Sequence, residues 1–359
     1  MNNENRIQNK AISKQCHSRR MPAEWEPSGA VLIAWPHTET DWEYMLDEVT
    51  KCYCNLVDAI LESGCKLIVV APDISVPQKH INNKNNDNII FCQVSTNDTW
   101  ARDFGPITVV DKDNQIKLID FCFNGWGLKF AACHDNLITS KLSKASVFNA
   151  PLENHLGFVL EGGSIESDGC GTILTTSECL LSPNRNGDLS RDKIEEYLCH
   201  SLGANRILWV NHGYLAGDDT DSHIDTLARL APNDTILYVK CDNTEDEHFQ
   251  ELSLMEHDLM AMRTPNDAPY NLIALPMPDP IFDEDGERLP ATYANFLITD
   301  TSILLPTYRQ PANDRLAEQI MQIAFPERKI ICVDCSALIR QHGSLHCVTM
   351  QLPKEILPI

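Results

Sequence analysis

Polar clusters interrupt an otherwise apolar sequence, and they carry the side chains that could do chemistry. The first lies in the segment 97–106, where Trp100 and Asp103 precede an apolar run. The second spans 160–164, where Glu161 ends an apolar run and two glycines follow it. Taken singly, the first fits a surface ion pair and the second an ordinary turn. Either could also carry a carboxylate from the core to a reactive site.

A third cluster runs through 217–225 and combines an imidazole with carboxylates. Alternation along an extended chain would place Asp219, Asp221, His223 and Asp225 on one side. This set could ligate a divalent cation. It could equally be a His–Asp acid/base pair whose carboxylate also binds a cationic substrate. An acidic solvated loop is the third interpretation.

The fourth cluster, 341–351, places a cysteine directly after a glycine turn and a histidine. A buried core thiol is the usual role of such a residue. Alternatively, Cys347 is a thiolate nucleophile at the start of a strand, its pKa lowered by a nearby imidazolium or a bound cation. In a strand, His346 would point to the opposite face, so we expect a structural role for it.

Together the clusters provide a thiol, an imidazole and several carboxylates, without a Ser triad, a phosphate-binding loop or a basic patch. Carboxylates match the planar donors of a guanidinium group bidentately. A thiolate beside such a receptor could attack the central carbon of the guanidinium. The combination therefore predicts hydrolysis of a C–N bond in a guanidine.

The elements that must position these clusters are short apolar runs and a few amphipathic helices. Helical spacing of apolar residues predicts helices within 41–64, 190–203, 245–262 and 313–326. Gly, Pro, Asp and Asn bound most of the strand-like runs. We expect strands at 30–36, 66–71, 88–94, 106–110, 116–123, 158–160, 172–175, 206–210, 235–240, 272–276, 295–298, 303–306 and 329–333. Their even spread, without a linker, predicts a single α/β domain.

Charge and composition narrow the choice of partners. The chain has 359 residues and a net charge of −22, which disfavours nucleic acid and anionic membranes and favours cations. No apolar run approaches the roughly 20 residues of a membrane span. The polar start gives no sign of a signal peptide, so we expect a cytoplasmic protein with reduced cysteines. The lone Cys332-x-x-Cys335 pair lacks the second ligand pair of a zinc site.

Nine motifs along nearly the whole chain resemble the bacterial-type peptidyl-arginine deiminase family, to which the agmatine deiminases belong, within the guanidine-modifying pentein superfamily. Nine motifs in the family's order are far more specific than any one of them. They are MPAEWEP (21–27), WP (35–36), DTWARDFGP (98–106), FNGWG (123–127), LEGGS (160–164), LLSPNRN (180–186), HID (223–225), NFL (295–297) and GSLHCVTMQ (343–351).

The resemblance implies an α/β pentein fold, with five ββαβ-like modules around a pseudo-fivefold axis and the active site in the central channel. The expected organisation is a flexible segment, 1–20, followed by one catalytic domain, 21–359. The resemblance also implies a small oligomer such as a homodimer, and neither a metal nor an organic cofactor.

The activity implied is hydrolysis of agmatine to N-carbamoylputrescine and ammonia through a covalent amidino-cysteine intermediate. Seven positions match the family's site: the nucleophile Cys347, the general acid/base His223, the carboxylates Asp103, Glu161 and Asp225, and the substrate contacts Asp219 and Trp100. Asp103 and Asp225 are expected to grip the guanidinium. Glu161 either bonds another guanidinium nitrogen or orients His223.

Alternatives remain at this stage. A peptidyl- or free-arginine deiminase would use the same chemistry, but free arginine needs a cation for its carboxylate, and Arg102 and Arg185 are the candidates. A dihydrolase or an amidinotransferase would also use the same guanidine-binding parts. A metal-dependent hydrolase could use the acidic cluster at 217–225 but leaves Cys347 without a role. A non-catalytic pentein acting as a binding module is disfavoured because all five catalytic positions are present.

Overall fold

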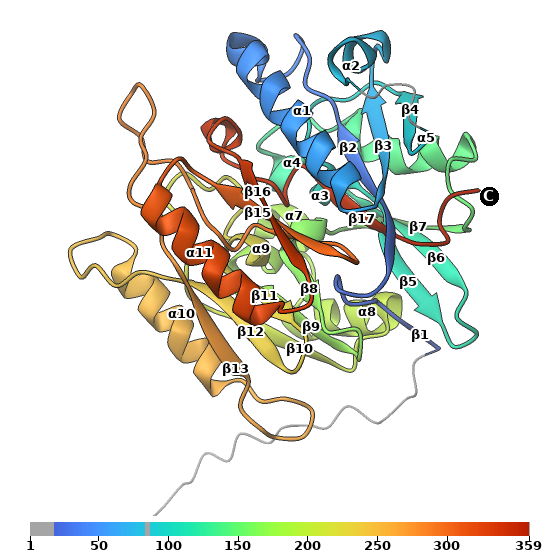
Figure 1. Ribbon diagram of the computed structural model, residues 1–359. Helices are drawn as coiled ribbons and strands as arrows, with labels where there is room; N and C mark the ends of the chain where they lie inside the picture. The colour runs from blue at the N-terminus through green and yellow to red at the C-terminus, as the bar shows by residue number, and fades with distance from the viewer. Residues whose placement is uncertain (1–17, 83–86, 359) are drawn as a thin grey trace, which may run out of the picture.

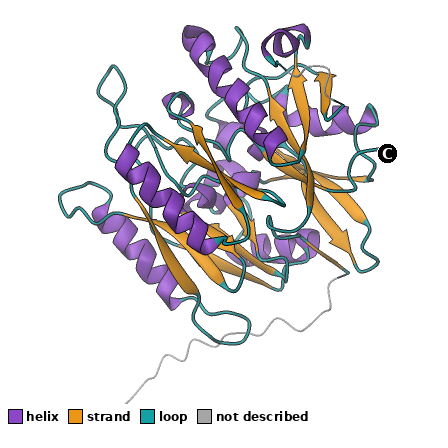
Figure 2. Ribbon diagram, in the orientation of Figure 1, coloured by secondary structure: helices purple, strands orange, loops and turns teal. Residues whose placement is uncertain are grey.

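Five small mixed sheets with helices along their flanks make up the part of the chain that the computed structural model describes, residues 18–82 and 87–358 (Figures 1 and 2). The strands of each sheet are given in spatial order. The first sheet contains β17 (Met350–Pro353), β2 (Ser28–Ala34), β3 (Lys66–Ala71) and β4 (Ile89–Gln93), and the second contains β1 (Arg19–Arg20), β5 (Ile107–Asp111), β6 (Ile116–Cys122) and β7 (Leu152–Val159). The other three sheets have three strands each: β10 (Arg206–Val210), β9 (Thr172–Thr176) and β8 (Ile165–Ser167); β11 (Ala228–Ala231), β12 (Thr235–Lys240) and β13 (Asn271–Pro276); and β14 (Leu297–Ile298), β15 (Ser302–Thr307) and β16 (Lys329–Asp334).

One pairing pattern recurs in all five sheets. A first strand pairs antiparallel with a second, and the second pairs parallel with a third. Parallel neighbours need a crossover connection, and helices supply it in each case. The principal crossover helices are α1 (Leu46–Glu62), α5 (Ile138–Lys144), α8 (Arg191–Leu202), α10 (Phe249–Ala261) and α11 (Pro311–Ala324).

Shorter helices connect the remaining segments. They are α2 (Ser75–His80), α3 (Ala101–Phe104), α4 (Gly125–Leu128), α6 (Ser177–Leu180), α7 (Pro183–Asn186), α9 (Ile224–Leu227) and the 3-10 turns η1 (Glu43–Met45), η2 (Asp135–Leu137), η3 (Gly162–Ser164) and η4 (Leu338–Gln341). No helix of the described residues is long and apolar enough to cross a membrane.

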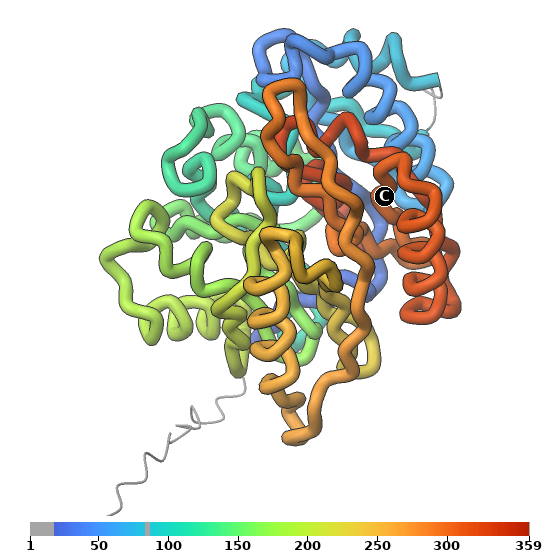
Figure 3. Tube along the Cα trace, turned by 90° about the vertical axis from the view of Figure 1, so that its left-hand side faces the viewer, coloured from blue at the N-terminus to red at the C-terminus, as the bar shows by residue number. Residues whose placement is uncertain are grey.

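A strand near the N-terminus and a strand near the C-terminus pair in one sheet. Strand β17 pairs antiparallel with β2, in the register Met350–Leu32, and Figures 1 and 3 show the C-terminal segment running back beside the N-terminal one. β2 and β3 are buried almost throughout, as expected of central strands covered on both faces. The early and late segments that carry functional residues are therefore held against a common core.

Helix ends follow the sequence signals closely. α1, within the predicted range 41–64, buries Val49, Tyr53, Leu56 and Ile60. α8 stops at Gly203, whose φ of +71° is the left-handed conformation that glycine adopts without a steric penalty. All four predicted helices and all thirteen predicted strand segments overlap elements of the structure, although the helix after 313 begins earlier, at Pro311.

Two local predictions are wrong. Residues 217–225 are not extended, because the Asp218 carboxylate accepts hydrogen bonds from the backbone of Thr220 and Ser222 and closes the chain into a turn. Asp221 then has a φ of +61°, and α9 begins at Ile224. Asp219, Asp221, His223 and Asp225 therefore do not share one face of a strand.

The second correction concerns Cys347, which lies in a turn before β17 and not in a strand. The Thr349 hydroxyl donates to the carbonyls of Leu345 and His346, which bends the chain here. The strand argument for the direction of His346 therefore fails.

The expected N-terminal segment 1–20 lies mostly outside the described residues, but Arg19 and Arg20 form β1 against β5. Both cysteines of the C-x-x-C pair are free thiols, Cys332 exposed in β16 and Cys335 buried.

Candidate active site

The recurring sheet pattern explains why residues far apart in sequence meet. In each sheet, a polar side chain lies two to four residues before a strand that pairs antiparallel with its neighbour. Asp103 precedes β5, Glu161 precedes β8, Asp225 precedes β11, Asn295 precedes β14 and Cys347 precedes β17. Four of these five positions were predicted from the sequence, whereas Asn295 was not, although it lies in one of the quoted motifs.

Cys347 and Asp103 line one cavity of about 120 Å³. Two indole rings, those of Trp100 and Trp126, form an edge-to-face pair in its wall, with centroids 6.4 Å apart. Such a cavity suits a slim ligand with an apolar chain. The other lining residues are Asp41, Asp98, Phe130, Asp218, Asp219, Thr220, Thr226, Gln341, His342 and Gly343.

Gly163 lies where three of the expected site residues converge. A Cβ atom built on Gly163 would lie 2.7 Å from His223 Nδ1, 2.9 Å from Asp103 Oδ1 and 3.1 Å from Asp225 Oδ2. Its own N–H donates to Asp103 Oδ1 at 2.9 Å. The glycine therefore allows an imidazole and two carboxylates to pack around one backbone atom.

We expect Gly163→Ala to lower kcat/KM by about 100-fold, because the added methyl must push His223 or a carboxylate out of position by a few tenths of an ångström or more. The cost in stability should be about 1–3 kcal/mol, as for other overpacked sites. Gly157→Ala is the control, because nothing lies within 4 Å of a Cβ there. Steady-state kinetics and thermal unfolding of both variants test this. Equal activity of the two would show that His223 and the carboxylates tolerate displacement.

The Asp103 carboxylate is buried and accepts two hydrogen bonds, one on each oxygen. Its Oδ1 accepts from Gly163 N and its Oδ2 from Trp126 Nε1, each at 2.9 Å. Burial and the nearby Asp225 raise the pKa of Asp103 well above its ordinary value. A cation placed between the two carboxylates would remove this penalty, so the pair is suited to binding one.

Asp225 is the opposite case. Burial raises the pKa of Asp225, but a 2.7 Å hydrogen bond from His346 Nδ1 and the neighbouring imidazoles outweigh burial, and the pKa lies below its ordinary value. Its Oδ1 is buried and has no hydrogen-bond partner among the described residues. Asp225 is therefore an ionised carboxylate with one oxygen held by protein and the other left for a ligand.

His223 is 1% exposed, and its Nδ1 lies 3.6 Å from Asp103 Oδ1. Burial lowers the pKa of His223 to about 3, so the ring is neutral near pH 7 in the empty site. Nε2 has no hydrogen-bond partner among the described residues. A neutral buried imidazole with available nitrogens can accept a proton during a reaction and return it later.

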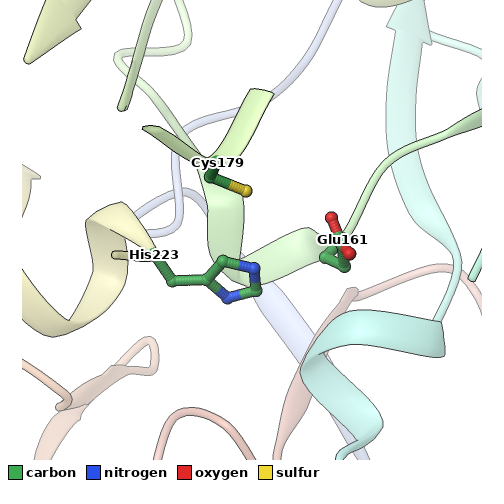
Figure 4. Close-up of side chains that lie close together, drawn as sticks. All are labelled: Glu161, Cys179 and His223. Carbon is green, nitrogen blue, oxygen red and sulfur yellow. The ribbon is translucent and has the colours of Figure 1, made fainter. Parts of the chain in front are cut away.

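Glu161 lies beside His223 and does not line the cavity. Both its oxygens accept from Arg185 Nε at 3.0 Å, and neither side chain has any exposed surface. Figure 4 shows the Glu161 carboxylate and the Cys179 thiol on the same side of the His223 ring. Arg185 is further fixed by Asp221 Oδ2 at 2.6 Å. This placement favours an orienting role for Glu161 over direct contact with substrate.

The metal-site interpretation of residues 217–225 does not fit the geometry. Among residues 18–82 and 87–358, two groups bring metal-binding atoms within 4.8 Å of one another: Glu161 with Cys179 and His223, and Glu24 with Glu166 and His346. In both, an arginine already occupies the carboxylates, Arg185 in the first and Arg229 in the second. Asp221 instead pairs with Arg185 and Lys129.

Asn295 fixes the turn that carries the cysteine. Its Oδ1 accepts from His346 N at 2.9 Å and from Cys347 N and Sγ at 3.3 Å each. Its Nδ2 donates to the Asp225 carbonyl at 3.3 Å. Burial, followed by the charges of Asp225 and Asp103, raises the pKa of Cys347 well above its ordinary value. The thiol is therefore protonated near pH 7.

The cavity lining is acidic. Asp41, Asp98, Asp218 and Asp219 belong to it, and no Lys or Arg side chain does so in the part of the chain that the structure describes. Asp219 is 42% exposed, with His342 Nδ1 at 3.8 Å. Trp100 packs on Gly343 and donates to Asp98. The structure thus gathers Asp103, Cys347, Asp219 and Trp100 around the cavity, with His223, Asp225 and Glu161 behind it.

Neither arginine considered for a substrate carboxylate faces the cavity. Arg102 lines a different pocket, with its Nη2 3.9 Å from Glu24, and Arg185 is held by Glu161 and Asp221. A ligand whose tail carries a carboxylate therefore meets several carboxylates and no Lys or Arg in the cavity lining, whereas a second ammonium group meets groups of opposite charge.

Comparison with known proteins agrees over nearly the whole chain. The profile of a family described as "Porphyromonas-type peptidyl-arginine deiminase" matches residues 20–353. A curated relative from Legionella pneumophila strain Philadelphia 1, named "Putative agmatine deiminase", is 35% identical over 340 residues, covering 93% of this chain and 95% of that protein.

Solved structures give the same result. The chain is similar to one titled "Putative Arginine Deiminase from Porphyromonas gingivalis", with 48% identity, a TM-score of 0.90 and coverage of 95% of this chain and all of that one. It is also similar to a variant of the C. jejuni agmatine deiminase with substrate bound, with 37% identity, a TM-score of 0.88 and coverage of 96% and 98%.

Proposed function

Because the chain belongs to the Porphyromonas-type peptidyl-arginine deiminase family, whose members hydrolyse C–N bonds, we propose that it is an agmatine deiminase. The reaction is hydrolysis of agmatine to N-carbamoylputrescine and ammonia. The observation that supports this choice of substrate is the cavity itself: a buried thiol lies near the carboxylates of Asp103 and Asp225, and the cavity lining holds further carboxylates without a Lys or Arg among the described residues. Agmatine is a dication, so both of its ends are matched.

In this proposal, Asp225 Oδ1 and Asp103 bind the guanidinium group. Asp225 is already ionised, and the arriving cation ionises Asp103 by offsetting the repulsion between the two carboxylates. Charge-assisted bonds to a planar guanidinium fix its orientation as well as its position. The bound cation also lowers the pKa of the Cys347 thiol, which the same carboxylates raise in the empty site.

The covalent step follows from these protonation states. Cys347 passes its proton to the neutral His223, and the thiolate attacks the central guanidinium carbon. A C–S bond forms while the C=N π electrons move onto nitrogen, giving a tetrahedral adduct. His223 then protonates one amino group, the C–N bond breaks, and ammonia leaves an amidino-cysteine.

Hydrolysis of this intermediate returns the enzyme to its first state. His223 takes a proton from water, and the hydroxide attacks the same carbon. The C–S bond breaks and the thiolate leaves. The hydroxyl group of the product loses its proton to the released ammonia, which gives the ureido C=O and ammonium, and His223 returns its proton to the Cys347 thiolate. Glu161, held by Arg185, keeps the His223 ring in place during both steps. We also propose that the five sheets, which share one strand-pairing pattern, surround a pseudo-fivefold axis, as in penteins, with this site at the centre.

Formation of ureido product from agmatine and from free arginine, side by side and with a chelator present, tests the proposal. We expect product from agmatine at a kcat/KM at least about 100-fold above that for arginine, because the arginine carboxylate meets the acidic cavity lining. Protein with Cys347→Ala is the blank. Product mainly from arginine would keep the mechanism and overturn the substrate; loss of activity in chelator would overturn the metal-free mechanism.

A further inference from the structure

A second imidazole lies behind the proposed guanidinium site. His346 Nδ1 is 2.7 Å from Asp225 Oδ2, and His346 Nε2 is 2.8 Å from Glu24 Oε2. The ring is 1% exposed, Asp225 is fully buried and Glu24 is 9% exposed. The imidazole therefore bridges two buried carboxylates, one in the site and one outside it. The mechanism above does not use His346 or Glu24.

Arg229 anchors the outer end of this chain of contacts. Its Nη2 donates to Glu24 Oε2 at 2.8 Å and lies 3.1 Å from His346 Nε2. Its Nε is bound to Glu166, and its Nη1 donates to the carbonyl of Ala294 at 3.2 Å. An arginine without exposed surface and with all its nitrogens engaged is a fixed positive charge. It holds Glu24 ionised and thereby fixes the far side of the His346 ring.

We propose that His346, backed by Glu24, is a positioning residue that keeps Asp225 ionised and turned toward the guanidinium group of the substrate. This inference rests on the proposed function, because it concerns how the same site binds its cation. Carboxylate oxygens of an ionised Asp225 can only accept, so the 2.7 Å contact requires a proton on His346 Nδ1. This Nδ1–H donor faces Asp225 in either state of the other nitrogen, whether Nε2 donates a hydrogen bond to Glu24 or accepts one from Arg229.

Other groups around Asp225 do not provide this hydrogen bond. The elements packed around Asp225 contribute other charged or titratable residues. These are Arg102 and Asp103 from α3, His223 just before α9, Arg229 from β11, and His346 and Cys347 from the turn before β17. Of these, His346 makes the hydrogen bond to the Asp225 carboxylate. Without it, burial and the neighbouring Asp103 would favour the protonated carboxyl group, which cannot pair with a cation.

The test measures agmatine binding against pH by calorimetry, in protein that also carries Cys347→Ala so that no turnover occurs. We expect His346→Phe to move the acidic limit of binding upward by about one pH unit or more, which weakens binding about tenfold at each pH below that limit. His346→Gln keeps a hydrogen-bond donor and should recover part of the loss. Glu24→Gln should give a smaller upward shift.

Glu166→Gln is the matched control, because it disturbs Arg229 in the same buried network without a hydrogen bond to His346. An acidic limit that moves equally in Glu166→Gln and His346→Phe would assign His346 a merely structural role and overturn the proposal. So would an unchanged limit in both His346 variants. Failure of the proposed function looks different: wild-type protein would then form no ureido product, and the Cys347→Ala parent would not bind agmatine at any pH.

Discussion

Cys347→Ala should lower turnover of agmatine by at least about 10⁴-fold, into the background of the assay, while agmatine still binds with a Kd within about tenfold of the wild-type KM. In the proposed mechanism the thiol forms the covalent bond to the substrate, and none of the remaining catalytic side chains can replace it. The groups proposed to grip the guanidinium, Asp103 and Asp225, remain in place. Steady-state assay of ureido product and calorimetry of the variant provide the two measurements.

Removing this thiol should change the stability of the fold only slightly. Cys347 forms no ion pair among the described residues, and its Sγ makes a hydrogen bond to the amide oxygen of Asn295. Cys332→Ala is the control, since Cys332 is an exposed thiol in β16. Retained turnover in the Cys347 variant would exclude a cysteine nucleophile. An unfolded variant would mean that Cys347 serves the core.

How the site is assembled was only partly predictable from the sequence. Polar residues that interrupt apolar runs draw attention to Asp103, Glu161, Asp225 and Cys347, and the family resemblance assigns their roles. The short strand runs likewise predict an α/β fold. What these four share, a place three or four residues before a strand that pairs antiparallel with its neighbour, becomes visible only in the pairing of the strands.

Roles that depend on distant contacts were not accessible from local patterns. His346 and Glu24 are separated by more than three hundred residues and yet share a hydrogen bond. Asn295 resembles any polar residue before a strand until its amide is seen to bind the cysteine turn. The direction of His346 was predicted from a strand that does not form there, because Thr349 bends the chain back. Period-two reasoning fails where side chains bond to the local backbone.

The pKa directions in the site fit the proposed order of events. Burial raises the pKa of Cys347 and of Asp103 and lowers that of His223 to about 3, whereas the pKa of Asp225 lies below its ordinary value. In the proposed mechanism, a bound guanidinium offsets the penalties on Asp103 and Cys347 together, so the nucleophile forms once the substrate is in place.

Because Asp225 has a lowered pKa and one buried oxygen without a partner among the described residues, Asp225→Asn should lower kcat/KM for agmatine by about 10²–10³-fold, equivalent to the roughly 3–4 kcal/mol lost when a buried charge pair loses one partner. The amide keeps the shape of the side chain but offers no charge to the guanidinium, and its NH₂ group can point at the cation. Weaker binding raises KM, and poorer alignment lowers kcat.

Asp219→Asn is the control for this prediction. Asp219 also lines the cavity but is 42% exposed, so the effect of this substitution on kcat/KM should stay within about tenfold. Steady-state measurements of kcat and KM for agmatine in both variants test this prediction, and circular dichroism verifies that both variants are folded. A folded Asp225→Asn enzyme with wild-type kinetics would remove Asp225 from the guanidinium site, and with it the role proposed for His346.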